Sequence, residues 1–204
     1  MNKIIVLLVS IFCFVGCVSM SSLQTARTTP KDTSQQSVGG GVYNSKMDVG
    51  ASTVETNLPY FEYSYRHGFT NDLDVGLKLT FIGAYAADAK YQIYTNDKFA
   101  FSAGAGLGYM SYKVSAGGED QEVKFLDVMV PIYLSYDFNP GFTLYTSPKY
   151  IMRQVSGSTT ENEGITGLTF GTKIGEKSGV FAEATVIKGK DNSAMTQYNI
   201  SYFW

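Results

Sequence analysis

The sequence predicts an all-β fold: an antiparallel up-and-down transmembrane β-barrel of about ten strands, with eight as the alternative count. Three observations support this prediction. Segments of about ten residues alternate apolar and polar side chains with a period of two. Glycine (21), tyrosine (15) and phenylalanine (13) are abundant, and this composition favours strands and turns over helices. Short turns and longer polar links also alternate along the chain, as in a barrel with tight turns at one end and loops at the other.

The first 16 residues predict a signal peptide and are left out of the fold. Lys3 supplies a positive charge, and an apolar run extends from Ile4 to Gly16. This run is shorter than the roughly 18 residues of a membrane-spanning helix, but it suits an export signal. Gly16 and Cys17 resemble the lipobox of bacterial lipoproteins, in which a small residue precedes a cysteine that becomes acylated, for example with palmitate. The alternative is an ordinary signal peptide with an incidental cysteine.

Cysteine usage favours the lipid anchor. Cys13 lies inside the apolar run, so cleavage would leave Cys17 as the only cysteine and would exclude a disulfide framework. Residues 17–33 are therefore predicted to form a lipidated tether, because the segment after Cys17 is rich in Ser and Thr and has little periodicity. Within it, the stretch LQTARTTPK (23–31) resembles the segment that leads into the first strand of some bacterial outer-membrane barrel proteins.

Residues 34–204 are predicted to form the barrel. The alternation is clearest in DLDVGLKLTF (72–81), KFAFSAGAGLGYM (98–110) and DVMVPIYLSYDF (127–138). In a membrane barrel the apolar members face lipid and the polar or small members face the lumen. We therefore expect Leu77, Phe101, Val130 and Ile132 to face lipid, and Lys78, Ser102, Met129 and Tyr133 to face the lumen.

The connections between these segments fall into two classes. Short turns are expected at 67–72, 95–98, 138–141 and 175–178. More polar, mostly longer links are expected at 45–57, 84–89, 111–122, 155–163 and 189–193. This order places both chain ends on the short-turn side of the barrel, where a periplasmic tether can lead into the first strand.

Two further segments resemble bacterial outer-membrane β-barrel proteins as a class. YRHGFTNDLDVGL (65–77) is similar to their periplasmic hairpins. The tail resembles their terminal assembly signal, with aromatic or apolar residues at alternate positions: Tyr198, Ile200, Tyr202 and Trp204. The resemblance implies a lipid-anchored, membrane-spanning protein of the bacterial outer membrane. Its implied partners are membrane lipids, the barrel-assembly and lipoprotein-processing machinery, and a protein bound through the outer loops or the tether.

A soluble barrel of the lipocalin type is the alternative fold, because such barrels also alternate but turn their apolar face inward. The polar face carries charges of both signs, which we expect to pair across a narrow lumen and fill it. These residues are Glu62, Arg66, Asp74, Lys78, Lys90, Asp127, Lys149, Lys173 and Glu183.

The sequence contains little that points to catalysis, metal or nucleic acid. The only histidine, His67, falls at a short inner turn and is expected to be a turn residue. Acidic residues on the outer links are expected to be solvated rather than to bind calcium: Glu119, Asp120, Glu122, Glu161 and Glu163. We therefore expect no cofactor, no metal and no enzymatic activity. The net charge of −2 offers no basic footprint for nucleic acid.

Three functions remain open. The chain is predicted to be a structural or interaction barrel. A narrow pore or conduit for small molecules is the first alternative, and an enzyme acting on membrane lipids is the weaker one.

Overall fold

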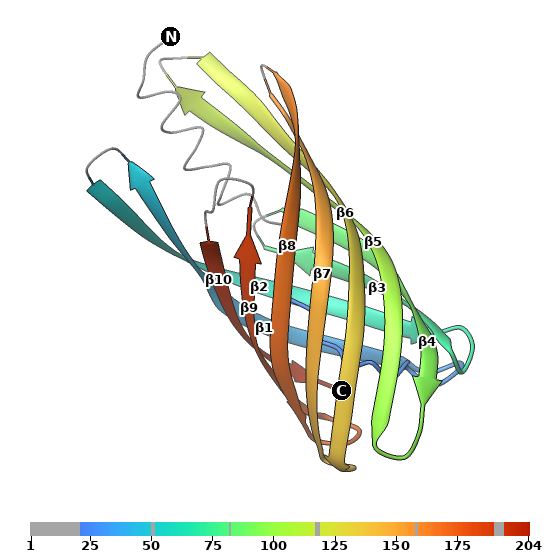
Figure 1. Cartoon of the computed structure of the whole chain (residues 1–204). Coiled ribbons are helices and arrows are strands. Elements are labelled where there is room, and N and C mark those ends of the chain that lie inside the picture. The colour runs from blue at the N-terminus through green and yellow to red at the C-terminus, as the bar shows by residue number, and fades with distance from the viewer. Residues whose placement is uncertain (1–20, 50–51, 82, 117–118, 158, 190–193) are drawn as a thin grey trace.

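The computed structural model describes residues 21–49, 52–81, 83–116, 119–157, 159–189 and 194–204. Within these residues the chain forms ten antiparallel strands that close into one barrel in chain order, with β1 against β10 (Figure 1). The strands are β1 (Ser34–Val49), β2 (Ser52–Gly68), β3 (Leu73–Thr80), β4 (Ala84–Thr95), β5 (Phe99–Ala116), β6 (Glu119–Asn139), β7 (Phe142–Ser156), β8 (Thr160–Ile174), β9 (Gly179–Lys188) and β10 (Ala194–Phe203). The described part of the chain holds no helix that is both long and apolar enough to cross a membrane.

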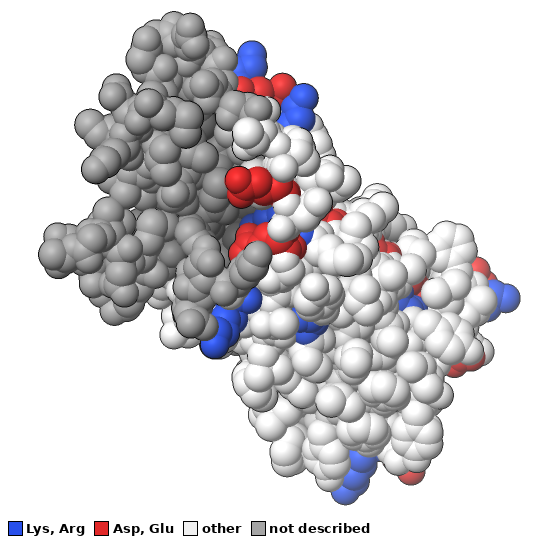
Figure 2. Space-filling model, turned by 45° about the horizontal axis from the view of Figure 1, so that its top comes forward, with Lys and Arg blue, Asp and Glu red and all other residues white. Residues whose placement is uncertain are grey.

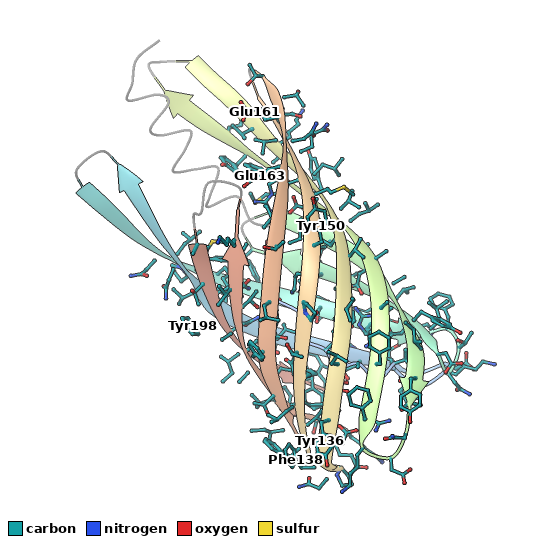
Figure 3. The ribbon with its side chains drawn as sticks, viewed as in Figure 1. Tyr136, Phe138, Tyr150, Glu161, Glu163 and Tyr198 are labelled. Atoms are coloured by element: carbon teal, nitrogen blue, oxygen red, sulfur yellow. The ribbon has the colours of Figure 1, made fainter. Side chains whose placement is uncertain are left out.

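The two faces of the wall have opposite chemistry. Leu77, Val130 and Ile132 are 55%, 48% and 40% exposed on the outside, whereas Ser102 and Tyr133 are buried on the inside. Large apolar and aromatic side chains surround the outer wall in the same way (Figure 3). An outer surface this apolar suits lipid and not water, so the lipocalin-type alternative is excluded.

The short turns lie where the sequence predicts them, and polar side chains hold them. The Thr70 hydroxyl accepts hydrogen bonds from the backbone amides of Asp72 (3.2 Å) and Leu73 (3.0 Å). In the next turn Asn96 accepts from the amide of Phe99 at 2.7 Å. Gly175 has a φ of 114°, a left-handed conformation that side chains other than glycine adopt at a cost.

The prediction of longer outer links was wrong in most places, because the strands extend into them. Residues 84–89 belong to β4, and most of 111–122 belongs to β5 and β6. Positions 119–122 are polar throughout, so the alternation is lost there, although the pairing of β5 with β6 continues. In 84–89 it disappears because alanine stands on both faces.

The outer rim of the barrel is uneven. β3 ends at Thr80 and β4 begins at Ala84, whereas β2 starts at Ser52 and β5 continues to Ala116. The hairpins β1–β2 and β5–β6 therefore rise well above the β3–β4 connection (Figure 1). This low point is called the β3–β4 rim below.

The last strand closes the barrel against the first. Ser37 pairs with Phe203, and the register continues to Ser45 opposite Met195. Gln36 and Trp204 exchange two backbone hydrogen bonds of 2.9 and 3.0 Å. The closure removes the unpaired sheet edges, which lipid does not tolerate.

Candidate functional site

The nine charged residues predicted to line the lumen all lie on the inner face of the wall, because each shares the strand parity of buried neighbours. Arg66, Lys78 and Lys173 are partly buried. The buried members are Glu62, Asp74, Lys90, Asp127, Lys149 and Glu183. Their role differs from the expected one, because most of them bind a segment of the chain that lies inside the barrel.

That segment is residues 21–33, here called the N-terminal strap. It enters at the short-turn end, where Lys31 bridges to Gly68, and leads back into the lumen toward Ser21. Leu23 and Ala26 are 4% and 0% exposed. The sequence analysis interprets these residues as part of a tether, but in the structure they fill the inner half of the barrel.

At the inner end the strap is fixed by Arg27 and Thr29. Arg27 forms an ion pair of 2.5 Å with Asp137 on β6 and donates to the backbone oxygen of Asn96 at 2.8 Å. The backbone amide of Thr29 donates to Asp74 on β3 at 2.7 Å. These contacts join the strap to β3, to the β4–β5 turn and to β6.

In the middle of the strap the wall supplies donors to the strap's carbonyl groups. Lys90 donates to the backbone oxygens of Thr25 (2.9 Å) and Arg27 (2.8 Å). The Ser102 hydroxyl donates to the backbone oxygen of Ala26. An extended segment without a neighbouring strand has unpaired backbone groups, which must find partners when buried.

At the Ser21 end of the strap, carboxylates of the wall accept hydrogen bonds from the strap. Glu183 accepts from the backbone amides of Ser22 (2.9 Å) and Leu23. Glu62 accepts from the Ser21 hydroxyl at 2.8 Å, and Lys78 donates to the Ser21 backbone oxygen at 2.5 Å. Anionic and cationic side chains of the wall therefore both bind the strap.

Packing completes the fit of the strap. Leu23 packs against Tyr145, Phe181 and Phe203, which form a buried cluster of the inner lumen. Leu23 has a φ of 47°, a conformation that costs a non-glycine residue about 1–3 kcal/mol and persists only where its surroundings fix it. The bond to Glu183 and the aromatic cluster supply that fixation.

Ion pairs between wall residues surround the strap. Arg66 contacts Asp74 at 2.5 Å and also contacts Asp88, and Lys90 lies 3.5 Å from Asp74. Asp88 was missed by the sequence analysis because 84–89 was assigned to a loop. Asp88 lies four residues after Ala84 and two before Lys90, so the period of two places it on the same face as Lys90. This was the available signal.

A second ion pair lies inside the lumen, toward the outer end of the barrel. Arg153 on β7 donates to both carboxylate oxygens of Asp127 at 2.8 and 2.6 Å, and its guanidinium lies over the Phe125 ring. The sequence analysis named Asp127 and missed Arg153. The register pairs these two residues directly, so strand alignment could have found the partner.

The outer half of the lumen also contains an apolar cluster. Its members come from β1, β2, β7, β8, β9 and β10: Tyr43, Tyr60, Ile151, Ile165, Ile187 and Met195. The expectation that paired charges largely fill the lumen therefore needs correction, since the strap occupies the inner half and apolar side chains occupy much of the outer half. Lys173 lies near the inner mouth, where its ammonium donates to the backbone oxygen of Glu176 at 3.3 Å.

The remaining predicted sites are placed as follows. His67 lies at the inner end of β2, where its Nδ1 is 2.9 Å from the Ser34 hydroxyl. Within the described residues no cluster of three metal-binding side chains occurs. Glu161 and Glu163 lie toward the outer end of β8 (Figure 3). Glu122 forms an exposed ion pair of 2.9 Å with Lys124.

The predicted anchor and the C-terminal tail differ in what the structure describes. Cys17, the predicted anchor, and the side chains of Glu119 and Asp120 lie outside the described residues. The tail residues Tyr198, Ile200, Tyr202 and Trp204 are 52%, 61%, 51% and 44% exposed on the outer wall of β10. Charged side chains in Figure 2 gather near the mouth and the ends of the barrel, with a broad uncharged band between them.

No protein-family model and no curated protein matches this chain. Solved structures do match. The outer-membrane protease OmpT from Escherichia coli is 10% identical, with a TM-score of 0.50 over 89% of this chain and 98% of OmpT. This chain has the fold of a bacterial outer-membrane β-barrel. The translocator domain of NalP from Neisseria meningitidis is 9% identical, with a TM-score of 0.48 over 84% of this chain and 88% of that domain.

Proposed function

We propose that the protein is a structural or interaction barrel of the bacterial outer membrane, closed by its own N-terminal strap. The supporting observation is the strap, whose backbone is bound by Lys90 and Glu183 in the inner half of the lumen. A closed lumen does not transport solutes. The surfaces that remain for binding are the lipid-facing outer wall and the tall outer hairpins.

Conductance in planar bilayers tests this proposal. The purified protein is expected to give no steady open channel at physiological salt. A variant that weakens the strap at two places, Lys90→Ala with Glu183→Gln, should give open events, which shows that the assay detects an unblocked barrel. A steady conductance of the unaltered protein would reject the closed barrel.

A narrow pore is the second candidate function, and one observation favours it. A cavity of about 1110 Å³ opens at the inner end, and its lining includes Arg27, Lys90, Asp137 and Lys173. The strap forms part of this lining, through Thr25 and Thr29 as well as Arg27, so solute that enters the vestibule meets the strap. In this alternative the strap is displaced to open the pore, and the same recording would show spontaneous openings of the unaltered protein.

We also propose that Cys17 carries a lipid anchor. Support comes from the Gly16–Cys17 pair at the end of the apolar run and from the absence of another cysteine after it. Cys17→Ser should abolish labelling by a fatty acid analogue, while the barrel still reaches the outer membrane through its lipid-facing belt. Unchanged labelling would remove the anchor from the proposal.

An enzymatic role has less support. OmpT is a protease, but a likeness at 10% identity concerns the fold alone. His67, the one histidine of the chain, lies at the short-turn end with a serine hydroxyl as its partner. We propose a non-enzymatic barrel whose partners are membrane lipids, the barrel-assembly and lipoprotein-processing machinery, and a protein that binds the outer hairpins or the tether.

A further inference from the structure

The strap brings the start of the described chain to the β3–β4 rim. Ser21 contacts Glu62 on β2 and Lys78 on β3. Glu62 pairs across the ladder with Thr80, which is the last residue of β3. The chain therefore reaches Ser21 at the level where the wall of the barrel is lowest.

An apolar groove of about 500 Å³ lies on the outer wall directly below this rim. Leu79 and Tyr85, a register pair next to the rim, line its upper end. Further down, Ala87 stands between Leu77 and Leu107 in the register, and its small side chain leaves the furrow between the two larger ones. The groove also includes Tyr63, Tyr65, Tyr109 and Leu126.

Chain length restricts where an anchor on Cys17 can go. Three residues separate Cys17 from Ser21, and the four steps between their Cα atoms reach at most about 14 Å at 3.3–3.6 Å per residue. The short-turn end of the barrel lies further away, because the strap itself needs the residues from Ser21 to Pro30 to reach it. While the strap is bound, Cys17 can reach lipid over the β3–β4 rim and not around the inner end.

We propose that the acyl chains on Cys17 cross the β3–β4 rim and lie in this groove, so that the anchor enters the membrane from the outer side. This inference rests on the proposed acylation of Cys17. The groove suits the occupant, because its lining consists of leucine, alanine, glycine and tyrosine without a charged side chain. Strap and anchor would then hold the barrel wall from both sides at the same place.

Photo-crosslinking tests the placement of the acyl chains. Cells grow with a fatty acid that carries a diazirine and an alkyne, and the irradiated protein is purified and digested. Mass spectrometry then identifies adducts in which the acylated N-terminal peptide is joined to a wall peptide. We expect the wall peptides to come from β3, β4 and β5. Adducts with β7 to β10, or adducts of the N-terminal peptide with free phospholipid alone, would overturn the inference.

Two variants sharpen the result. Ala87→Phe fills the groove and should reduce the adducts with β3 to β5 by about tenfold. Ala184→Phe makes the same change on the outer face of β9, opposite Tyr198 and Phe170, and should leave them unchanged. Heat-modifiable gel mobility verifies that each variant folds, and Ala87→Leu replaces Ala87→Phe if the latter does not. Equal adduct yields in the groove and control variants would contradict the proposed site. Absence of any label on Cys17 would instead reject the acylation itself.

Discussion

Replacing Glu183 by glutamine should loosen the strap without unfolding the barrel. In the structure this buried carboxylate accepts from the backbone amides of Ser22 and Leu23 and from the Tyr145 hydroxyl at 2.7 Å. A hydrogen bond to a charged group contributes about 1.5–3 kcal/mol and a neutral one about 0.5–1.5 kcal/mol. Glutamine keeps one acceptor oxygen and the shape of the side chain. Ser22 donates to Oε2 and Leu23 to Oε1, so the amide oxygen of glutamine can replace only one of these two acceptors. One strap amide therefore keeps a neutral bond, at a loss of about 1 kcal/mol, and the other loses its acceptor, at a cost of about 1–3 kcal/mol.

Taken at the lower end, these losses amount to about 2 kcal/mol, which corresponds to a roughly 30-fold larger population of released strap, since every 1.4 kcal/mol is a factor of ten. Hydrogen exchange of the protein in lipid nanodiscs measures this population, because protected amides exchange through local opening. Peptides that cover 21–29 should exchange about 30-fold faster in Glu183→Gln than in the unaltered protein. Amides in β7 and β8 should keep their rates.

Glu161→Gln serves as the matched control, because it makes the same change at an exposed position toward the outer end of β8. It should leave the strap peptides unchanged. The reasoning fails if the strap of the unaltered protein exchanges as fast as a free peptide. It also fails if Glu183→Gln accelerates the strands and the strap equally, because the carboxylate would then support the barrel as a whole.

Three further predictions concern the wall. Arg153→Leu should lower the free energy of unfolding in urea by about 3–5 kcal/mol, because it leaves Asp127 buried without its partner. Asp127→Asn in the same chain should restore much of the loss. A loss that the second change does not reduce would contradict this. Val130→Arg on the lipid-facing wall should lower the free energy of unfolding in lipid vesicles by about 2–4 kcal/mol, whereas Val130→Leu should leave it nearly unchanged. Equal effects of the two changes would argue against lipid at this face. Deletion of 202–204 should prevent accumulation in the outer membrane, because β1 then lacks its closing partner near Gln36. Trp204→Phe should assemble normally, as measured by heat-modifiable gel mobility. Normal assembly of the truncated chain would refute an assembly role of the tail.

Those features of the fold that follow from one strand at a time could be predicted from the sequence. The period of two in 127–138 separates Val130 from Met129, and the structure places the first on the outer wall and the second inside. Turn chemistry at Asn96 fixed the connection between β4 and β5. Failures occurred where both faces have the same chemistry, as in 84–89, because period two is then invisible although the backbone ladder persists.

The strap could not be derived in this way. A sequence rich in Ser and Thr is as compatible with a solvated tether as with a buried segment, because the difference lies in the partners. Those partners are on β2, β3, β4, β5, β6, β7 and β9, and only the closed barrel brings them together. The one local signal was the stretch 23–31, which resembles segments preceding the first strand in outer-membrane barrels, but the sequence analysis assigned it to the tether.

The mixture of charge signs in the lumen has a simpler explanation once the strap is in place. A water-filled pore needs no particular alternation of cations and anions along its wall. A buried segment without a neighbouring strand does, because its carbonyl groups require donors and its amide groups require acceptors. Lys90 and Lys78 meet the first need, and Glu183 and Asp74 meet the second. Most of the charges that the sequence presents as pairs across a lumen are thus binding partners of the strap, while Arg66 and Asp127 form ion pairs with other wall residues. This arrangement favours a closed barrel over an open pore.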